Sequence, residues 1–140
     1  MKHSFPSSVV ELLQRLVRIP SVNPEGASEK KHEHCGEQKI ARDVATILRD
    51  LGADVRFDEV LEGRPNVIGT FPCAGEPTCR LLLAPHLDTV GTSGMTIDPF
   101  GGDLRDGKIW GRGASDTKGT AAAMLWALHE MRDDLANLPI

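Results

Sequence analysis

The sequence is poor in cysteine and in aromatic residues: its 140 residues include three Cys, four Phe, two Trp and no Tyr. Three irregularly spaced cysteines match neither a disulfide framework nor a zinc ribbon, so we expect reduced thiols. Proteins that stack nucleic-acid bases rely on interleaved aromatic side chains, which these six residues do not supply. The core is therefore expected to be mostly aliphatic.

Positive charge and long apolar runs are also scarce. The chain has 16 Lys and Arg against 20 Asp and Glu, a net charge of −4, and Lys30–Lys31 is its only adjacent basic pair. The longest apolar run, residues 121–128, is far shorter than the roughly 20 residues of a membrane-spanning helix. Residues 1–6 lack the apolar segment of a signal peptide. We therefore expect no nucleic-acid partner, no membrane association and a cytoplasmic location.

Apolar residues at helical spacing predict three helices. The first follows Ser8, which opens an S-x-x-E capping box, and ends near Ile19, the residue before a proline. The second covers residues 40–51, with Gly52 as its stop signal. The third covers residues 118–135. The inward residues expected in the third helix are Ala121, Met124, Leu128, Met131 and Leu135.

Strand patterns lie between the second and third helices. Residues 53–57 alternate between apolar and polar types, and residues 66–71 form a second candidate strand. The nearly continuous apolar run over residues 80–84 predicts a central strand covered on both faces. Asp106-Gly107 predicts a hairpin turn. This order predicts the α/β fold class, with a mixed β-sheet layered with helices.

The first candidate site follows the predicted central strand, where ligands bind in open α/β sheets. His86 is followed two residues later by Asp88. In metal sites a carboxylate often accepts a hydrogen bond from one imidazole nitrogen and so orients the other nitrogen toward the ion. His86 is therefore a candidate ligand and Asp88 its orienting partner. The alternative is purely structural: His86 caps a strand end and Asp88 opens a turn.

The second candidate site is the glycine-rich segment of residues 111–119 (GRGASDTKG), before the third helix. Gly119 falls in the first helical turn, where glycine costs roughly 1 kcal/mol relative to alanine, so helix propensity does not explain it. Asp116 is a candidate metal ligand on a tight loop, and the alternative is an ordinary helix N-cap. The segment matches neither a P-loop, because Lys precedes Gly, nor a dinucleotide fingerprint, because the third glycine is missing.

A third cluster, residues 32–35 (HEHC), has metal-binding residue types. Its two histidines are only two positions apart, and it is not a helical H-E-x-x-H motif. We interpret it as a solvated loop.

Four segments together resemble a known family, the co-catalytic metallohydrolases that include acetylornithine deacetylase, succinyl-diaminopimelate desuccinylase, carboxypeptidase G and aminoacylase. Residues 16–24 (LVRIPSVNP) are similar to the family's opening helix and turn, and residues 86–90 (HLDTV) to its H-x-D-T-V box. Residues 98–100 (DPF) and 106–119 resemble its hairpin and G-R-G-x-x-D-x-K-G box. The chain departs from the family at Pro85, where glycine is usual.

The resemblance implies a set of roles for these residues. His86 would be a ligand of one metal ion, Asp116 would bridge two ions, and Asp88 would orient His86. The two divalent ions are usually zinc in this family and sometimes cobalt, and they polarise an amide carbonyl and activate water. The implied substrate is a small N-acylated amino acid or a peptide.

One element of the family pattern is absent from these 140 residues. Family members continue with an adjacent pair of glutamates, one the general base and the other a ligand, and this sequence has no Glu-Glu pair. We expect residues 1–140 to be the N-terminal portion of a zinc-peptidase-like catalytic domain, without the lid and dimerisation domain. By itself this portion is expected to be inactive and to self-associate through open strand edges. The alternative is a non-catalytic truncated relative that acts as a binding or complementation module.

Overall fold

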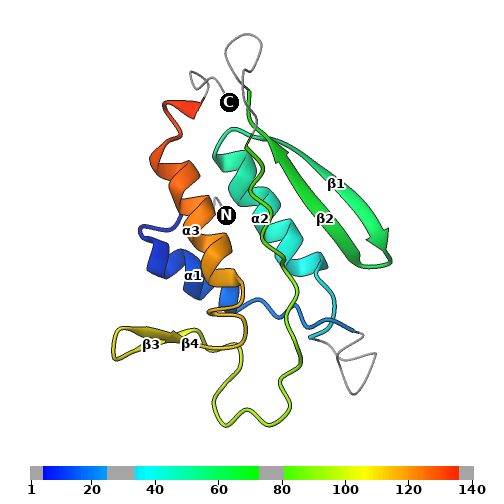
Figure 1. Cartoon of the computed structure of the whole chain (residues 1–140), viewed down its shortest axis with the longest axis vertical. Helices are drawn as coiled ribbons and strands as arrows, with labels where there is room; N and C mark the ends of the chain where they lie inside the picture. Colours follow the sequence, from blue (N-terminus) through cyan, green and yellow to red (C-terminus); the bar gives the residue numbers. More distant parts are fainter. Residues whose placement is uncertain (1–4, 25–33, 73–80, 136–140) are drawn as a thin grey trace.

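The computed structural model describes residues 5–24, 34–72 and 81–135 (Figure 1). The elements are, in chain order, α1 (Val9–Val17), α2 (Gln38–Asp50), β1 (Asp54–Leu61), β2 (Arg64–Thr70), β3 (Asp103–Arg105), β4 (Lys108–Trp110) and α3 (Lys118–Glu130). A helix with the length and apolar character of a membrane span is absent from these described ranges.

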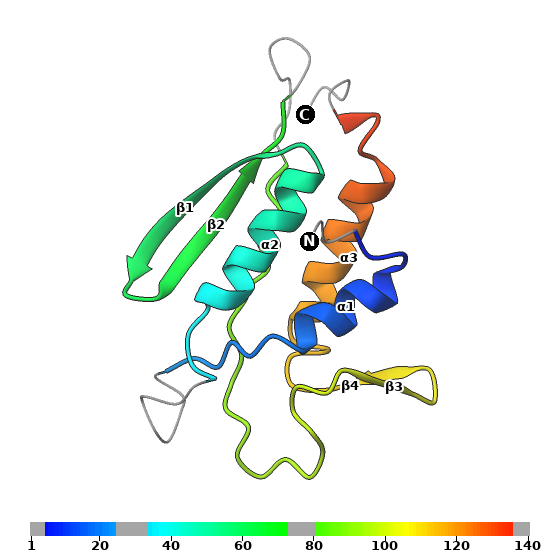
Figure 2. The same ribbon diagram turned by 180° about the vertical axis from the view of Figure 1, so that it is seen from behind.

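The core of the described part lies among the three helices. α1 packs against α3, and α2 packs against the β1–β2 hairpin, as Figures 1 and 2 show from opposite sides. The buried residues of this core are all aliphatic, as the composition predicted: Leu12, Leu16, Ile40, Val44, Ile47, Leu48, Leu51, Ala121, Ala122 and Leu125.

The first two helices lie where the sequence predicted them. The hydroxyl of Ser8 caps α1 by accepting a hydrogen bond from the backbone N–H of Glu11 at 3.2 Å. The Glu11 carboxylate accepts from the backbone N–H and the hydroxyl of Ser7, so the reciprocal half of the capping box is shifted by one residue. α2 ends just before Gly52, whose φ of +92° is the left-handed conformation common after helix ends.

The third helix is shorter than predicted, and its predicted inward face is confirmed only in part. Ala121 is buried and Leu128 packs against the core, as predicted. α3 ends at Glu130, and Met131, predicted to face inward, is 42% exposed. The buried residues of α3 are Lys118, Ala121, Ala122 and Leu125. The prediction was incomplete because residues 121–128 are apolar on every side of the helix, so their periodicity does not select a face. Packing against α1 selects it instead.

Two antiparallel hairpins account for the named strands of the described residues. β1 and β2 pair with Asp54 opposite Thr70, and α2 covers them so closely that a Cβ at Gly69 would lie 3.1 Å from the Leu48 side chain. β3 and β4 are joined by Asp106-Gly107, as predicted, with φ of +52° and +70° at its two residues.

The predicted central strand is wrong for the part of residues 80–84 that the structure describes. Residues 81–84 form no strand, and Leu81 and Leu82 are 66% and 85% exposed. A strand requires backbone partners along its edge, and no described residue pairs with this run. The α/β class is confirmed, but the described residues form two small antiparallel sheets, with parallel pairing only at two isolated bridges.

Candidate metal site

The first part of the site is residues 81–90, which we call the extended arm. It runs along α2, between β2 and α3 (Figure 1). Its C-terminal end is held by the connection that follows α1: the N–H of Thr89 donates to the carbonyl of Ser21 at 2.9 Å. The buried hydroxyl of Ser21 donates to the carbonyl of Leu87 at 2.7 Å, across 66 positions of sequence. Distant residues therefore position the arm.

The second part of the site is residues 111–117, which we call the glycine loop, between β4 and α3. The loop is shaped by bonds within itself and to the following helix, and by a bond from the N–H of Arg112 to the carbonyl of Pro99 at 2.7 Å. The N–H of Ala114 donates to the carbonyl of Gly111 at 3.3 Å, and the N–H of Lys118 donates to that of Gly113 at 2.9 Å. The Asp116–Thr117 peptide bond is cis.

Three glycines allow close packing around this loop. Gly111 has φ of +153°, and a Cβ there would lie 2.4 Å from the Val17 side chain. Gly113 has φ of +81°, and its Cβ would lie 2.8 Å from the Thr89 side chain of the extended arm. At Gly119 a Cβ would lie 2.5 Å from a backbone carbonyl oxygen of the loop. This contact explains why a glycine stands in the first turn of α3, which helix propensity did not explain.

The two parts bring the predicted site residues together. Nε2 of His86 lies 3.1 Å from Oδ1 of Asp116, although 30 positions separate them in sequence. The other ring nitrogen, Nδ1, lies 3.0 Å from the carbonyl oxygen of Asp88 and 3.2 Å from its carboxylate Oδ1. Because both Asp88 oxygens are acceptors, Nδ1 carries the proton in this arrangement, and Nε2 is the nitrogen directed at Asp116.

The electrostatics of the site favour the protonated form of His86. Partial burial lowers the pKa of His86, but the hydrogen bonds to Asp88 and Asp116 and their two negative charges outweigh it. The net result is a pKa of His86 above its ordinary value. The two carboxylates therefore stabilise positive charge on the ring.

Three residues behind Asp88 were not found from the sequence. The amide of Asn23 donates to Oδ2 of Asp88 at 2.9 Å, and a terminal nitrogen of Arg64 lies 3.9 Å from the same oxygen. Arg64 in turn contacts the buried carboxylate of Glu37 at 2.8–3.0 Å. Asn23 falls in the turn of the family resemblance, which was its only signal. No local pattern distinguishes Arg64 or Glu37 from other charged residues.

Lys118 is a fourth residue whose position the sequence did not predict. It lies in the G-R-G-x-x-D-x-K-G box, is only 1% exposed, and its ammonium donates to the carbonyl of Ile19 at 2.7 Å. Burial lowers the pKa of Lys118 from 10.5 to about 8. This side chain ties the glycine loop to the end of α1.

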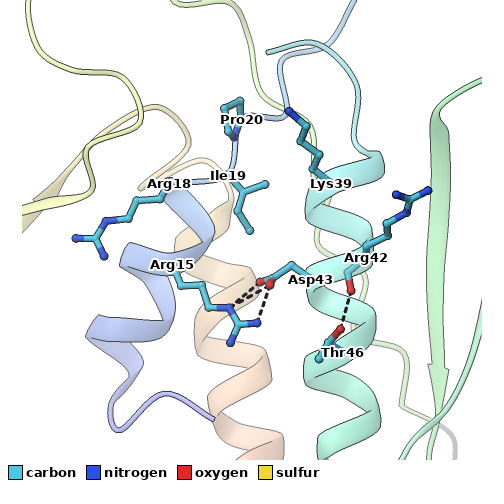
Figure 3. A pocket seen from close by; sticks show the side chains of 8 residues that line it. All are labelled: Arg15, Arg18, Ile19, Pro20, Lys39, Arg42, Asp43 and Thr46. Atoms are coloured by element: carbon cyan, nitrogen blue, oxygen red, sulfur yellow. Dashed lines mark hydrogen bonds and ion pairs between the residues drawn. The ribbon is translucent and has the colours of Figure 1, made fainter. Parts of the chain in front are cut away.

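The His86–Asp116 pair lines a hollow of about 280 Å³ between the extended arm and the glycine loop. A larger hollow, of about 480 Å³, lies between α1 and α2 and contains none of the predicted site residues. Figure 3 shows that Arg15, one of its cationic side chains, binds Asp43, and that the other three, Arg18, Lys39 and Arg42, point in different directions.

The donor set fits part of a metal centre. An imidazole nitrogen and a carboxylate oxygen suit zinc and cobalt, and two ligands on one tetrahedral zinc ion would stand about 3.3 Å apart, close to the 3.1 Å observed. Among the described residues, no group of three His, Cys, Asp or Glu side chains gathers to hold an ion. The roles of His86 and Asp116 as ligands stay predictions.

The third cluster is only partly described, because His32 and Glu33 lie outside the described residues. His34 and Cys35 are half-buried, so these two do not form a solvated loop. The ring of His34 lies 4.9 Å from that of Phe100.

The chain is similar in sequence to proteins of known family. Residues 82–140 match the family described as Peptidase family M20/M25/M40. The succinyl-diaminopimelate desuccinylase of Wolinella succinogenes is 36% identical over 122 residues, which are 86% of this chain and 29% of that protein. The enzyme of the same name from Methylobacterium radiotolerans is 35% identical over 129 residues, 89% of this chain and 30% of that protein.

The fold is shared with a solved structure as well. The crystal structure of human carnosine dipeptidase 1 superimposes with a TM-score of 0.69 at 26% identity, covering 94% of this chain and 30% of that one. The chain thus spans about 30% of the length of the relatives that it matches. Over residues 82–140 this chain thus matches the peptidase family M20/M25/M40, and the desuccinylase relatives and the shared fold agree with that match.

Proposed function

We propose that this chain supplies His86 and Asp116 as ligands to the divalent-metal centre of a hydrolase that cleaves amide bonds. The proposed substrate class is a small N-acylated amino acid or a peptide, which agrees with the relatives' names, desuccinylase and dipeptidase. In this proposal residues 1–140 form part of a catalytic domain, and Asp116 is shared between two ions, zinc or cobalt.

One observation carries the proposal: Nε2 of His86 and Oδ1 of Asp116 face each other at 3.1 Å at the rim of a hollow. Both side chains are accessible, with His86 52% and Asp116 88% exposed. An ion pair that served stability alone would gain little at such exposed positions. Accessible, converging nitrogen and oxygen donors are what a metal ligand pair requires.

The residues of this chain have separate tasks in the proposed reaction. His86 and Asp116 would hold the divalent ion, which would supply Lewis-acid polarisation of the amide carbonyl and of water. Asp88 holds Nδ1 of His86, so that the lone pair of Nε2 points into the hollow. The carboxylate of Asp116 offsets positive charge at the same point.

Metal titration tests the proposal directly. We expect Co²⁺ and Zn²⁺ to bind, measured by calorimetry and by the visible absorption of Co²⁺. His86→Ala and Asp116→Asn should each weaken binding by more than the roughly 10–100-fold typical of losing an outer partner. Asp58→Asn and His129→Gln, which lie away from the hollow, serve as controls. Equal affinity in all five proteins would contradict the ligand assignment.

A second function is favoured by one feature of the site: in the part of the chain that the structure describes, two predicted ligands converge and no third His, Cys, Asp or Glu joins them. A non-catalytic relative that binds or complements another polypeptide would also show this feature. We expect the 140 residues alone to give no metal-dependent cleavage of an N-succinyl amino acid or a dipeptide, because the sequence has no adjacent Glu pair. Turnover by the purified chain would refute this inactivity. Turnover only after mixing with a second polypeptide that supplies the Glu pair would support complementation.

A further inference from the structure

Two residues, Asn23 and Arg64, contact Oδ2 of Asp88, and Arg64 is itself bound by Glu37. We propose that Asn23 and the Arg64–Glu37 ion pair are positioning residues, which fix the carboxylate of Asp88 and through it the orientation of the His86 ring. This inference rests on the proposed function for its consequence, metal affinity, but not for its structural content.

The first observation is that the two carboxylate oxygens of Asp88 have different partners. Oδ1 lies 3.2 Å from Nδ1 of His86, whereas Oδ2 accepts the hydrogen bond from the amide of Asn23 at 2.9 Å. A carboxylate bound through only one oxygen can rotate about its last bond, because such terminal torsions have broad minima. A partner on each oxygen restricts that rotation. Asn23 therefore sets the plane in which Asp88 meets the imidazole.

The second observation is the arginine that stands beside Oδ2. A terminal nitrogen of Arg64 lies 3.9 Å from Oδ2 of Asp88, close enough for charge attraction in a half-buried setting. The guanidinium is itself fixed: Nε lies 2.9 and 3.0 Å from the two oxygens of Glu37, and a terminal nitrogen lies 2.8 Å from one of them. Such a planar fork gives a defined orientation that a lysine ammonium does not provide.

The third observation is burial of the anchoring carboxylate. The side chain of Glu37 is only 8% exposed, and Arg64 is the cation at its side. A buried carboxylate is costly unless it is paired, so Glu37 holds Arg64 firmly in place. Glu37 precedes α2 and Arg64 begins β2, while Asn23 follows α1. The three residues thus come from separate segments of the chain: Asn23 and Arg64 contact Asp88, and Glu37 contacts Arg64.

A second arginine–carboxylate ion pair, away from the site, serves as a control. Arg15 on α1 binds Asp43 on α2 through contacts of 2.6–3.1 Å, with both side chains about one fifth exposed (Figure 3). This pair lines the other hollow and touches none of the site residues. Arg15→Met therefore removes an arginine fork of similar burial without disturbing Asp88.

The test compares Asn23→Ala, Arg64→Met and Arg64→Lys with the parent chain and with Arg15→Met. Because Arg64→Met leaves Glu37 buried and unpaired and can unfold the protein, the double variant Glu37→Gln/Arg64→Met removes both charges. Circular dichroism checks that each variant is folded. Two readouts follow: the ¹⁵N shifts of the His86 ring without metal, at an alkaline pH beyond which these shifts no longer change, and the Co²⁺ dissociation constant.

We expect the parent chain to hold the tautomer with the proton on Nδ1. Asn23→Ala and the double variant should shift the ring toward the other tautomer and weaken Co²⁺ binding by roughly 10–100-fold, as for outer partners of metal ligands. Arg64→Lys should recover part of the loss, because it keeps the charge without the fork. Arg15→Met should match the parent chain in both readouts.

The two readouts separate this inference from the proposed function. Unchanged ring shifts and unchanged affinity in folded Asn23→Ala and double variants would overturn the inference and leave the metal proposal standing. Ring shifts that change while no protein, including the parent chain, binds Co²⁺ would support the positioning role and refute the metal centre. Equal losses in Arg15→Met would overturn the inference, because they would show a general effect on stability.

Discussion

The extended arm and the glycine loop contribute one predicted ligand each, but they are held in place differently. The arm is fixed by hydrogen bonds to Ser21 and Asn23, more than sixty positions away in sequence. The loop has two backbone hydrogen bonds within residues 111–118, in addition to bonds from Arg112 to Pro99 and from Lys118 to Ile19. The arm begins with exposed leucines, whereas the loop is packed around Gly113, which is buried. The position of His86 therefore depends on contacts that are distant in sequence, whereas that of Asp116 depends on local bonds and distant contacts together.

The largest effect is expected from a side chain added to the glycine loop. Gly111→Ala places a Cβ 2.4 Å from the Val17 side chain and 3.1 Å from the carbonyl of Pro99, at a φ of +153°. Overpacking and backbone strain together should lower the free energy of unfolding by about 4 kcal/mol. Urea denaturation followed by circular dichroism measures this loss.

A matched glycine separates strain from packing in this experiment. Gly107 has φ of +70° in the β3–β4 turn, and a Cβ there would meet nothing within 4 Å. Gly107→Ala should therefore cost only the strain, about 1–2 kcal/mol. If both variants lost equal stability, close packing of the loop would not be what holds it.

The next effect concerns Lys118 and pH. The folded pKa of about 8 lies below the ordinary 10.5, so between these values the unfolded chain binds more protons than the folded chain. The free energy of unfolding should therefore rise with pH across this window, by up to about 3 kcal/mol. Below it, both states are protonated and the full cost of burying the charge remains.

Lys118→Met removes this titration. The variant should lose the extra rise in stability between about pH 8 and 10.5, while all other groups titrate as before. Denaturation midpoints measured along a pH series reveal the difference between the two proteins. If the stability of the parent chain and of Lys118→Met changed equally with pH, Lys118 would keep its ordinary pKa. It would then not be a buried side chain that joins the loop to α1.

The exposed start of the extended arm should cause the chain to self-associate. Leu82 is 85% exposed on a segment without strand partners among the described residues. We expect the chain to self-associate through this edge, and Leu82→Lys to weaken association by about 1.5–3 kcal/mol, the value of burying one leucine. Sedimentation equilibrium gives both constants. A parent chain that stays monomeric at high concentration would show that the arm does not act as an open edge.

The smallest effect tests the long-range attachment of the arm. Ser21→Ala removes the buried hydroxyl that donates to the carbonyl of Leu87 at 2.7 Å, and should cost about 1 kcal/mol. Thr46→Ala also removes a hydroxyl that donates to a backbone carbonyl, but on the exposed face of α2, and should change stability by less than about 0.5 kcal/mol. Equal losses would mean that burial adds nothing to the attachment.

Much of the fold was predictable because its signals are local. Ser8 and Gly52 mark helix ends by chemistry that involves only neighbouring residues, and Asp106-Gly107 specifies its own turn. The failures have one physical origin. The all-round apolar character of α3 and the apolar run of residues 81–84 show that burial is favoured, but the surface that provides it belongs to other segments.

The candidate site divides in the same way. The sequence by itself determined the residue types of the site, the glycines that permit the tight loop and the α/β class. Only the tertiary structure decided that His86 and Asp116 meet at 3.1 Å, and that Asn23, Arg64 and Glu37 stand behind Asp88. Sequence patterns record the local preferences of neighbours, whereas contacts across 30 to 66 positions arise only when the helices and hairpins pack together.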